Sequence, residues 1–410
     1  MRRYSACLLA IVFAGRVIGQ SPPALEAAAA LDDELAAAVD RGDVPGLVAM
    51  AATRKRVLYE GAFGLADVGH DRRMTTDALF RIASMTKPVT SVAAMQLYEQ
   101  GRFALDDPAE KYLPELSNPM VFDSFDTASG AYTLRPARTK ITIRHLFTHT
   151  SGLAYGFTSA IVRDFKPRDG EHYEAGPLLF DPGTEWIYGT SSDWLGRLVE
   201  KLSGENLEDY FRQHIFVPLG MEDTSYNVPE NKQPRLVTVH QRPAGRRDEA
   251  LVERANQPQR PATSFSGGGG LVSTAGDYAR FARMILNDGT LDGEQILTAA
   301  SIAEMSRNQL GTVRVRALRS AEPDLSDDFS FIEDLKDEWG LGFLLNETHE
   351  PGKRSSGSLS WGGLDNTYFW IDPTRGVAGV ILMQFLPFAD PKALAIYDGF
   401  ERGVYRMPTF

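Results

Sequence analysis

Short apolar runs typical of β-strands lie at both ends of this chain, and helical patterns fill the middle. Residues 44–64 read as two strands around a turn at Arg54-Lys55. From residue 339 onward, further apolar and aromatic runs are separated by Gly, Pro and Asp. This order predicts one antiparallel sheet built from both termini and flanked by helices, with a large all-helical insertion. The predicted fold class is α/β, of the α+β kind.

The same pattern predicts a two-part domain. The sheet subdomain would comprise residues 24–79 and 339–410, and the helical subdomain residues 80–338. An active-site cleft is expected between the two parts.

Helices are predicted where apolar residues recur about once per turn. An Ala-rich segment, residues 23–42, is one of them. A second helix would have Ser191 or Ser192 as its N-cap and stop at Gly204, and a third would be capped by Thr274. The last residues of the chain read as a closing helix.

Two stretches have no regular pattern, residues 117–140 and residues 317–338. The second is strongly acidic. It reads as a solvated surface loop, and a flap over the cleft is the alternative.

The first 19 residues have the layout of a secretory signal peptide. Arg2 and Arg3 precede an apolar stretch that small residues follow. The stretch is too short to span a bilayer as a helix, so we expect no stable membrane anchor. We expect an exported protein, periplasmic or extracellular, that starts near Gln20; a buried N-terminal helix is the alternative. Cleavage would remove Cys7, the only cysteine, and with it any thiol nucleophile.

The charge balance argues against some partners. The chain has 43 basic and 54 acidic residues and a net charge of −11 at pH 7. Phosphate backbones are bound through clustered Lys and Arg. The chain is acidic overall and has no basic run, so we expect no nucleic-acid partner.

A serine and a lysine stand three positions apart in "RIASMTKPVTS", at the start of an apolar helical run. On a helix such positions share a face, so Ser84 and Lys87 would point the same way. A serine hydroxyl becomes a good nucleophile only when a base takes its proton. Burial disfavours a charged ammonium, so a partly neutral Lys87 could be that base. The spacing alone is a weak signal.

Two further elements strengthen this interpretation. Tyr188 lies in a loop just before a predicted helix, where its hydroxyl could shuttle a proton beside a lysine. Gly362 and Gly363 follow an apolar strand and would let the backbone approach a ligand closely.

Six stretches together resemble the serine β-lactamase-like, penicillin-recognising hydrolases, and most closely class C β-lactamases and family VIII carboxylesterases. They are "FRIASMTKPVTS", "ITIRHLFTHTSGL", "DPGTEWIYGTSSDWLGRLVEKLSG", "FVPLGMEDT", "FSGGGGLVSTAGDYARFARMILNDG" and "SWGGLDNTYFWIDP". S-x-x-K is a signature of this acyl-enzyme chemistry.

The resemblance implies a role for each matching residue. Ser84 would be the acylated nucleophile and Lys87 its proton acceptor or electrostatic partner. Tyr188 would share the base role and protonate the leaving group. The backbone N–H groups of Ser84 and Leu364 would form the oxyanion hole. The triplet Trp361-Gly362-Gly363 would line the cleft in place of Lys-Thr-Gly.

The chain departs from the β-lactamase pattern at two positions. Thr190 stands where the family's Tyr-x-Asn element has its Asn, which contacts the acylamino chain of a β-lactam. Trp361 replaces the lysine that attracts the β-lactam carboxylate. Both changes point away from an efficient β-lactamase, and Trp-Gly-Gly resembles the family VIII esterases.

Three other patterns lack a required residue. His145 and His149 have the spacing of a zinc motif, without its Glu or a third ligand, so we expect packed or capped histidines and no metal. The glycines at 267–270 lack the G-K-[ST] of a phosphate loop and predict a flexible turn. No G-x-S-x-G is present, which excludes an α/β-hydrolase nucleophile elbow.

The predicted function is a secreted serine hydrolase without a cofactor, a carboxylesterase for short to medium acyl esters. A β-lactamase, a D-amino-acid peptidase or amidase, and an acyltransferase stay open on the same site. A penicillin-binding-like module with little turnover is a further alternative. The expected partner is a small-molecule ester or amide substrate; its identity and the oligomeric state stay open.

Overall fold

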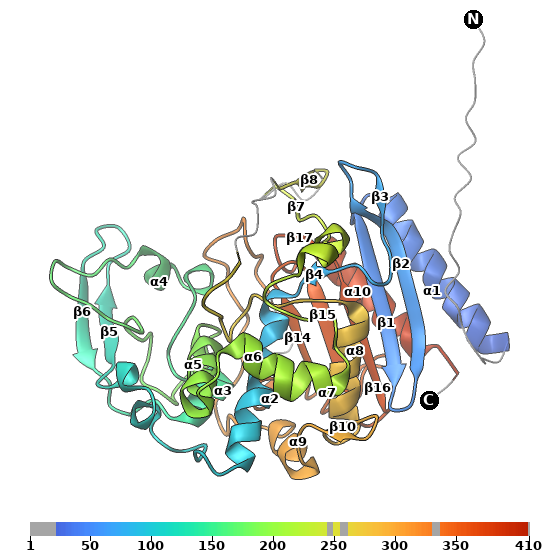
Figure 1. Ribbon diagram of the computed structural model, residues 1–410. Coiled ribbons are helices and arrows are strands. Elements are labelled where there is room, and N and C mark those ends of the chain that lie inside the picture. Colours follow the sequence, from blue (N-terminus) through green and yellow to red (C-terminus); the bar gives the residue numbers. More distant parts are fainter. Residues whose placement is uncertain (1–21, 244–248, 255–260, 330–336, 409–410) are drawn as a thin grey trace, which may run out of the picture.

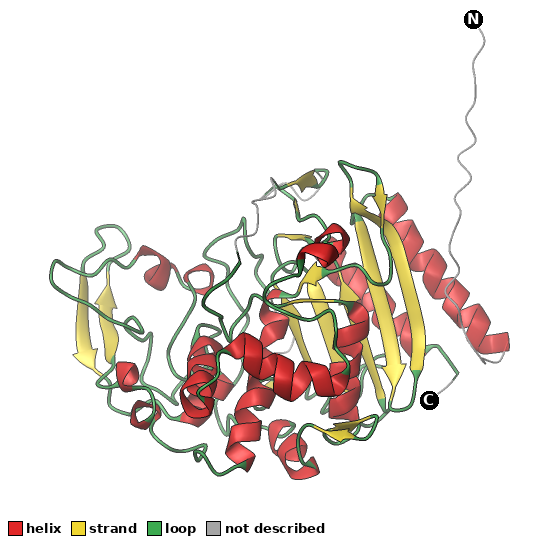
Figure 2. Cartoon of the chain, in the orientation of Figure 1, coloured by secondary structure: helices red, strands yellow, loops and turns green. Residues whose placement is uncertain are grey.

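An eight-stranded sheet organises the protein (Figures 1 and 2). The computed structural model describes residues 22–243, 249–254, 261–329 and 337–408, so the predicted signal peptide lies outside it. The strand order is β12-β13-β14-β15-β16-β1-β2-β3. The bounds are β1 Gly46–Thr53, β2 Val57–Asp67, β3 Arg72–Arg73, β12 Glu338–Trp339, β13 Leu344–Leu345, β14 Leu359–Gly363, β15 Thr367–Asp372 and β16 Val377–Leu382.

The two ends of the chain meet inside this sheet. β1, from the N-terminal part, pairs antiparallel with β16, from the C-terminal part, with Met50 opposite Val380. β15 and β16 are buried along their whole length, as expected for central strands covered on both faces. The structure thus confirms the predicted mixed α/β fold with a sheet from both termini.

Helices cover both faces of the sheet. α1 (Pro22–Asp40) and α10 (Pro391–Tyr405) pack together on one face, and α8 (Ala275–Leu286) lies against β1 and β16 on the other (Figure 1). The predicted cap of α8 is confirmed, because the Thr274 side chain accepts from the backbone N–H of Asp277.

The middle of the chain supplies the remaining helices: α2 Thr86–Glu99, α3 Ile143–Thr148, α4 Ala160–Asp164, α5 Ser191–Ser203, α6 Leu207–Phe211, α7 Val217–Leu219 and α9 Ala299–Met305. α2 is buried along most of its length and packs against α5. The predicted N-cap of α5, Ser191 or Ser192, was one or two residues late, since Thr190 is the N-cap and Ser191 is already helical. Its stop is as predicted, with Gly204 in the left-handed conformation at φ 80°.

Short strands complete the fold: β4 Phe80–Arg81, β7 His240–Gln241, β8 Val252–Glu253, β9 Val272–Ser273, β10 Thr290–Leu291, β11 Glu294–Gln295 and β17 Phe385–Leu386. β4 pairs with β9, which ties the chain just before Ser84 to the segment just before α8.

The stretch 117–140, predicted to be irregular, contains a β-hairpin. β5 (Met120–Phe125) pairs with β6 (Tyr132–Pro136) at the edge of the molecule far from the large sheet (Figure 1). A register shift between Phe122 and Ser124 interrupts the alternation of side chains along β5, so the sequence shows no regular strand pattern here.

Residues 317–329, most of the described part of the acidic stretch, pack onto the body of the protein. Leu318 and Phe329 are buried, and the N–H of Ala321 donates to the Phe157 carbonyl at 2.8 Å. This segment therefore lies against the loop that carries Phe157. No helix among the described residues is long and apolar enough for a membrane span.

Candidate active site

Ser84 lies in a short turn between β4 and α2. The turn, Ala83–Met85, is a 3-10 helix that runs directly into α2. Ala83 has a φ of 42°, a left-handed conformation that costs a non-glycine residue free energy. Long-range bonds hold the turn, because Ile82 donates to the Leu271 carbonyl and the Tyr278 hydroxyl to the Met85 carbonyl. The fold thus presents Ser84 on a strained, fixed turn.

Lys87 lies within hydrogen-bond distance of Ser84, as the spacing predicts. Its side chain is buried, and Nζ lies 3.1 Å from the Ser84 Oγ. Nζ also donates to the Gly268 carbonyl at 2.6 Å and lies 3.1 Å from the Tyr155 hydroxyl. Three oxygens therefore surround the nitrogen. A neutral amine can donate two N–H groups to Gly268 and Tyr155 and keep its lone pair for the Ser84 proton.

Tyr188 contributes its ring to this cluster. The Lys87 Nζ lies over the ring, 4.7 Å from its centroid, which is a cation–π contact when the amine is charged. The Tyr188 hydroxyl accepts a hydrogen bond from the indole N–H of Trp361 at 3.3 Å. The catalytic role of Tyr188 stays a prediction, and the phenol bonded to Lys87 is that of Tyr155.

The loop that carries Tyr188 is held by His149. The N–H of Gly189 donates to His149 Nδ1 at 3.5 Å, and the imidazole and Tyr188 rings lie 5.0 Å apart. Burial, and then the nearby Lys87, lower the pKa of His149 well below its usual value. A neutral ring can accept the Gly189 bond, which fits a packed structural histidine.

The Trp361-Gly362-Gly363 triplet ends β14 beside the nucleophile turn. A Cβ on Gly363 would lie 2.2 Å from the Ile82 carbonyl oxygen, so the close approach of the two chains requires glycine. Leu364, the predicted oxyanion donor, is the next residue after this strand. Thr190 is half-buried at the N-cap of α5, and its carbonyl accepts from Asp193. The roles of Leu364 and Thr190 stay predictions.

Sequence reasoning missed Tyr155 and Gly268. Tyr155 follows the matched stretch "ITIRHLFTHTSGL" by two positions, which was its only signal. Gly268 belongs to the glycine run read as a flexible turn, and its carbonyl is instead the closest partner of Lys87. No sequence spacing relates the Tyr155 phenol or the Gly268 carbonyl to Lys87, because both groups approach the lysine only when distant segments of the chain pack together.

The two histidines of the zinc-like spacing have separate surroundings. His145 Nδ1 accepts from the Thr142 N–H at 3.2 Å, and burial lowers the pKa of His145 to about 4. His149 instead holds the Tyr188 loop. Within residues 22–243, 249–254, 261–329 and 337–408, no group of three or more His, Cys, Asp or Glu is placed to bind a metal.

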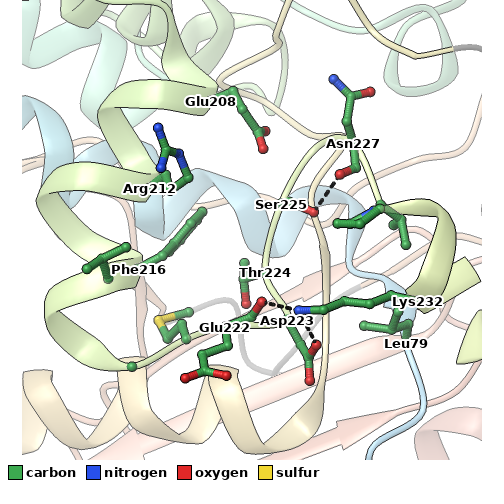
Figure 3. A pocket seen from close by; sticks show the side chains of 15 residues that line it. Leu79, Glu208, Arg212, Phe216, Glu222, Asp223, Thr224, Ser225, Asn227 and Lys232 are labelled. Atoms are coloured by element: carbon green, nitrogen blue, oxygen red, sulfur yellow. Dashed lines mark hydrogen bonds and ion pairs between the residues drawn. The ribbon is translucent and has the colours of Figure 1, made fainter.

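A cavity of about 400 Å³ lies near α6 and α7 and has none of the predicted site residues in its lining (Figure 3). Its polar groups bond one another: Lys232 pairs with Asp223 at 2.9 Å and donates to the Glu222 carbonyl, and Ser225 donates to the Asn227 carbonyl. The Ser84–Lys87 cluster therefore lies outside this cavity.

The chain is similar to known enzymes along most of its length. The monacolin J acid methylbutanoyltransferase of Aspergillus terreus (strain NIH 2624 / FGSC A1156) is 32% identical to this chain, over 90% of this chain and 93% of its own length. The lovastatin esterase of Penicillium rubens is 29% identical, over 92% of this chain and 98% of its own length. The unliganded simvastatin synthase structure from Aspergillus terreus is similar with a TM-score of 0.78 and 27% identity, over 95% of this chain and all of its own.

A family model described as Beta-lactamase matches residues 31–401, which include every residue of the cluster around Lys87. That range, together with the alignment of a 32% identical relative over 90% of the chain, shows that this chain belongs to the β-lactamase family of serine enzymes.

Proposed function

We propose that the protein is a serine esterase that cleaves short to medium acyl esters through an acyl-enzyme on Ser84. The observation that carries this proposal is the 3.1 Å distance from Lys87 Nζ to Ser84 Oγ on a buried helix start. As Ser84 Oγ bonds the acyl carbon, its proton passes to Lys87. The proton then goes to the departing alkoxide, and water releases the acid in a second step.

The developing oxyanion would be held by the backbone N–H groups of Ser84 and Leu364. Such donors are worth most when the fold fixes them before the reaction begins. The strained turn at Ala83 and the close packing of Gly363 on Ile82 support a rigid pair.

The Trp361 side chain favours an ester over a β-lactam as the substrate. Its indole is 3% exposed and its N–H is bonded to Tyr188. An indole has one N–H donor and no charge, so it cannot form an ion pair with the carboxylate of a β-lactam. An uncharged ester instead gains apolar contact there.

Acyl transfer to an alcohol is the second candidate, favoured by the similarity to the monacolin J acid methylbutanoyltransferase over nine tenths of the chain. Both reactions share the acyl-enzyme, and they differ only in whether water or an alcohol takes the acyl group. Amidase, D-amino-acid peptidase, β-lactamase and slow-turnover penicillin-binding activities are the remaining alternatives on this site.

A single assay separates these activities. p-Nitrophenyl esters of two to twelve carbons are offered with and without an alcohol acceptor, and product acid and transferred ester are quantified beside nitrocefin. An esterase gives free acid with or without the acceptor, whereas an acyltransferase is accelerated by the alcohol and gives a new ester. Release of one nitrophenol per chain followed by arrest would overturn the esterase proposal in favour of a slow-turnover module.

We also propose that the protein is exported, because of the signal-like layout of residues 1–19. The intact mass of the protein from its native host tests this. Export predicts a chain that starts near Gln20, and a chain that retains Met1 to Gly19 would refute it.

A further inference from the structure

The Asp193 carboxylate contacts two residues that lie within hydrogen-bond distance of the Lys87 amine, Tyr155 and Gly268. Asp193 lies in the first turn of α5. Its Oδ2 accepts from the Tyr155 hydroxyl at 3.2 Å, and its Oδ1 accepts from the Gly268 N–H at 3.3 Å and from the Ser266 hydroxyl. The Tyr155 oxygen and the Gly268 carbonyl both lie within hydrogen-bond distance of Lys87 Nζ.

The carboxylate determines the direction of these hydrogen bonds. Burial, followed by the charge of Asp193, raises the pKa of Tyr155 well above its usual value, so the phenol keeps its single proton. An ionised carboxylate can only accept, so that proton points to Asp193. The Tyr155 oxygen is then left to accept from Lys87, and the amine lone pair is left for Ser84.

Gly268 leaves just enough room for this contact. A Cβ at this position would lie 2.4 Å from Asp193 Oδ2 and 2.6 Å from the Tyr155 hydroxyl oxygen. A side chain here would therefore separate the carboxylate from the phenol.

We propose that Asp193 is a positioning residue that orients Lys87 toward Ser84 through Tyr155 and Gly268. The inference rests on the proposed acyl-enzyme function of Ser84. Asp193 itself forms no bond with substrate. It keeps the Lys87 lone pair directed at the Ser84 proton, which moves from Oγ to Nζ as the acyl bond forms.

The competing explanation is that Asp193 only stabilises α5. A carboxylate in the first turn of a helix interacts favourably with the helix dipole, typically by about 0.3–1 kcal/mol. That role would change the stability of the protein but not the reactivity of Ser84. α8 offers a matched control, because Asp277 is also the third residue of its helix and is buried.

The test compares Asp193→Asn with Asp277→Asn. Asn keeps the shape but has only one acceptor oxygen, so its N–H₂ group must face either the Tyr155 hydroxyl or the Gly268 N–H. In either orientation, one of the two residues that hold Lys87 loses its hydrogen bond to position 193. We expect kcat for p-nitrophenyl butyrate to fall about 10- to 100-fold with little change in KM, the range seen for groups that orient metal ligands from the outer shell. Asp277→Asn should keep wild-type kcat, although it lowers the melting temperature.

The pH profile adds a second readout. Lys87 is faced by the Ser84 and Tyr155 hydroxyls, the Tyr188 ring and neutral His149, with Asp193 behind Tyr155. Removal of the Asp193 charge should therefore change the acid limb of kcat/KM, whereas removal of the more distant Asp277 charge should leave it unchanged. Tyr155→Phe should lower kcat similarly, and the double variant should lose little more than the worse single variant.

Fluorophosphonate labelling of Ser84 separates this inference from the proposed function. Labelling reports the reactivity of the serine without any ester substrate, and it should be slowed in Asp193→Asn but not in Asp277→Asn. Wild-type labelling rate and kcat in Asp193→Asn would overturn the inference. If the wild type labels at Ser84 but turns over no ester, the esterase proposal fails, while the comparison of labelling rates still decides the role of Asp193.

Discussion

The indole N–H of Trp361 is donated to the Tyr188 hydroxyl oxygen, with 3.3 Å between the two heavy atoms. The rings lie 4.9 Å apart, and the ring of Trp339 lies 4.7 Å from that of Trp361. The position that would carry a cation in a β-lactamase-like site is therefore occupied by one member of a cluster of buried aromatic side chains.

We expect kcat/KM for a short-chain p-nitrophenyl ester to exceed that for nitrocefin by at least about 100-fold. A charge-assisted hydrogen bond to the lactam carboxylate would contribute about 1.5–3 kcal/mol, which is roughly 10- to 150-fold in binding. Trp361 cannot supply that bond, and the ester does not need it. Steady-state rates for both substrates on the same preparation measure the ratio.

Trp361→Lys should narrow this ratio, with Trp361→Phe as the control that keeps an apolar ring. Because Trp361 is only 3% exposed, the lysine variant would bury an ammonium near Lys87, and its folding must be checked by circular dichroism. Equal turnover of nitrocefin and the ester by the wild type would contradict the carboxylate argument and favour a β-lactamase.

Ser84 is expected to be the only residue labelled by a fluorophosphonate. Ser84→Ala should abolish labelling and ester hydrolysis while it leaves the melting temperature close to wild type, because the side chain is small and half-buried. Peptide mass spectrometry of the adduct locates the label. An adduct on another serine, or full activity in Ser84→Ala, would mean that the nucleophile lies elsewhere.

Lys87→Ala and Tyr188→Phe should each lower kcat strongly, since general acid–base groups contribute about 10²–10⁴-fold. Tyr188→Phe keeps the ring over the lysine and removes only the hydroxyl that bonds Trp361. If the two residues act as a unit, the double variant should lose far less than the product of the single losses. Multiplicative losses would show that Tyr188 works independently of Lys87.

Asp390→Ala should lower the free energy of unfolding by about 3–5 kcal/mol, as expected when one partner of a buried ion pair is removed. Asp390 lies 2.6 Å from Arg242, and both side chains are 1% exposed. Asp164→Ala breaks the exposed pair with Arg163 and should cost only about 0–1 kcal/mol. Urea denaturation of both variants provides the comparison, and similar losses would contradict the burial argument.

Asp181 should make the protein sensitive to acid. Two hydrogen bonds from Arg135 at 2.9 Å, followed by the Arg138 N–H, lower the pKa of Asp181 from 3.8 to about 2. A carboxylate with a lowered pKa stabilises the folded state above pH 4, and this contribution is lost as pH falls toward 2. Melting temperatures should therefore fall less steeply between pH 4 and 2 in Asp181→Asn. If the melting temperature falls with pH as steeply in Asp181→Asn as in the wild type, the ion pair between Asp181 and Arg135 of β6 contributes nothing to the free energy of unfolding.

Local spacing in the sequence determined much of this protein. The Ser84–Lys87 contact follows from positions one helical turn apart. The Thr274 cap and the Gly204 stop depend on residues adjacent to their helices. The strands at the two ends were recognisable because each is a short apolar run, and such runs in a mixed pattern have few ways to pair.

Only the tertiary structure decided which groups meet Lys87. Tyr155 is 68 residues away in the chain and Gly268 is 181 residues away, so no periodicity relates them to the lysine. The sequence favoured Tyr188 as the hydroxyl partner, yet the fold turns its hydroxyl to Trp361, and Asp193 points at Tyr155. Backbone periodicity predicts which face of an element a side chain occupies, but the packing of distant segments decides which polar atoms come within hydrogen-bond distance of one another.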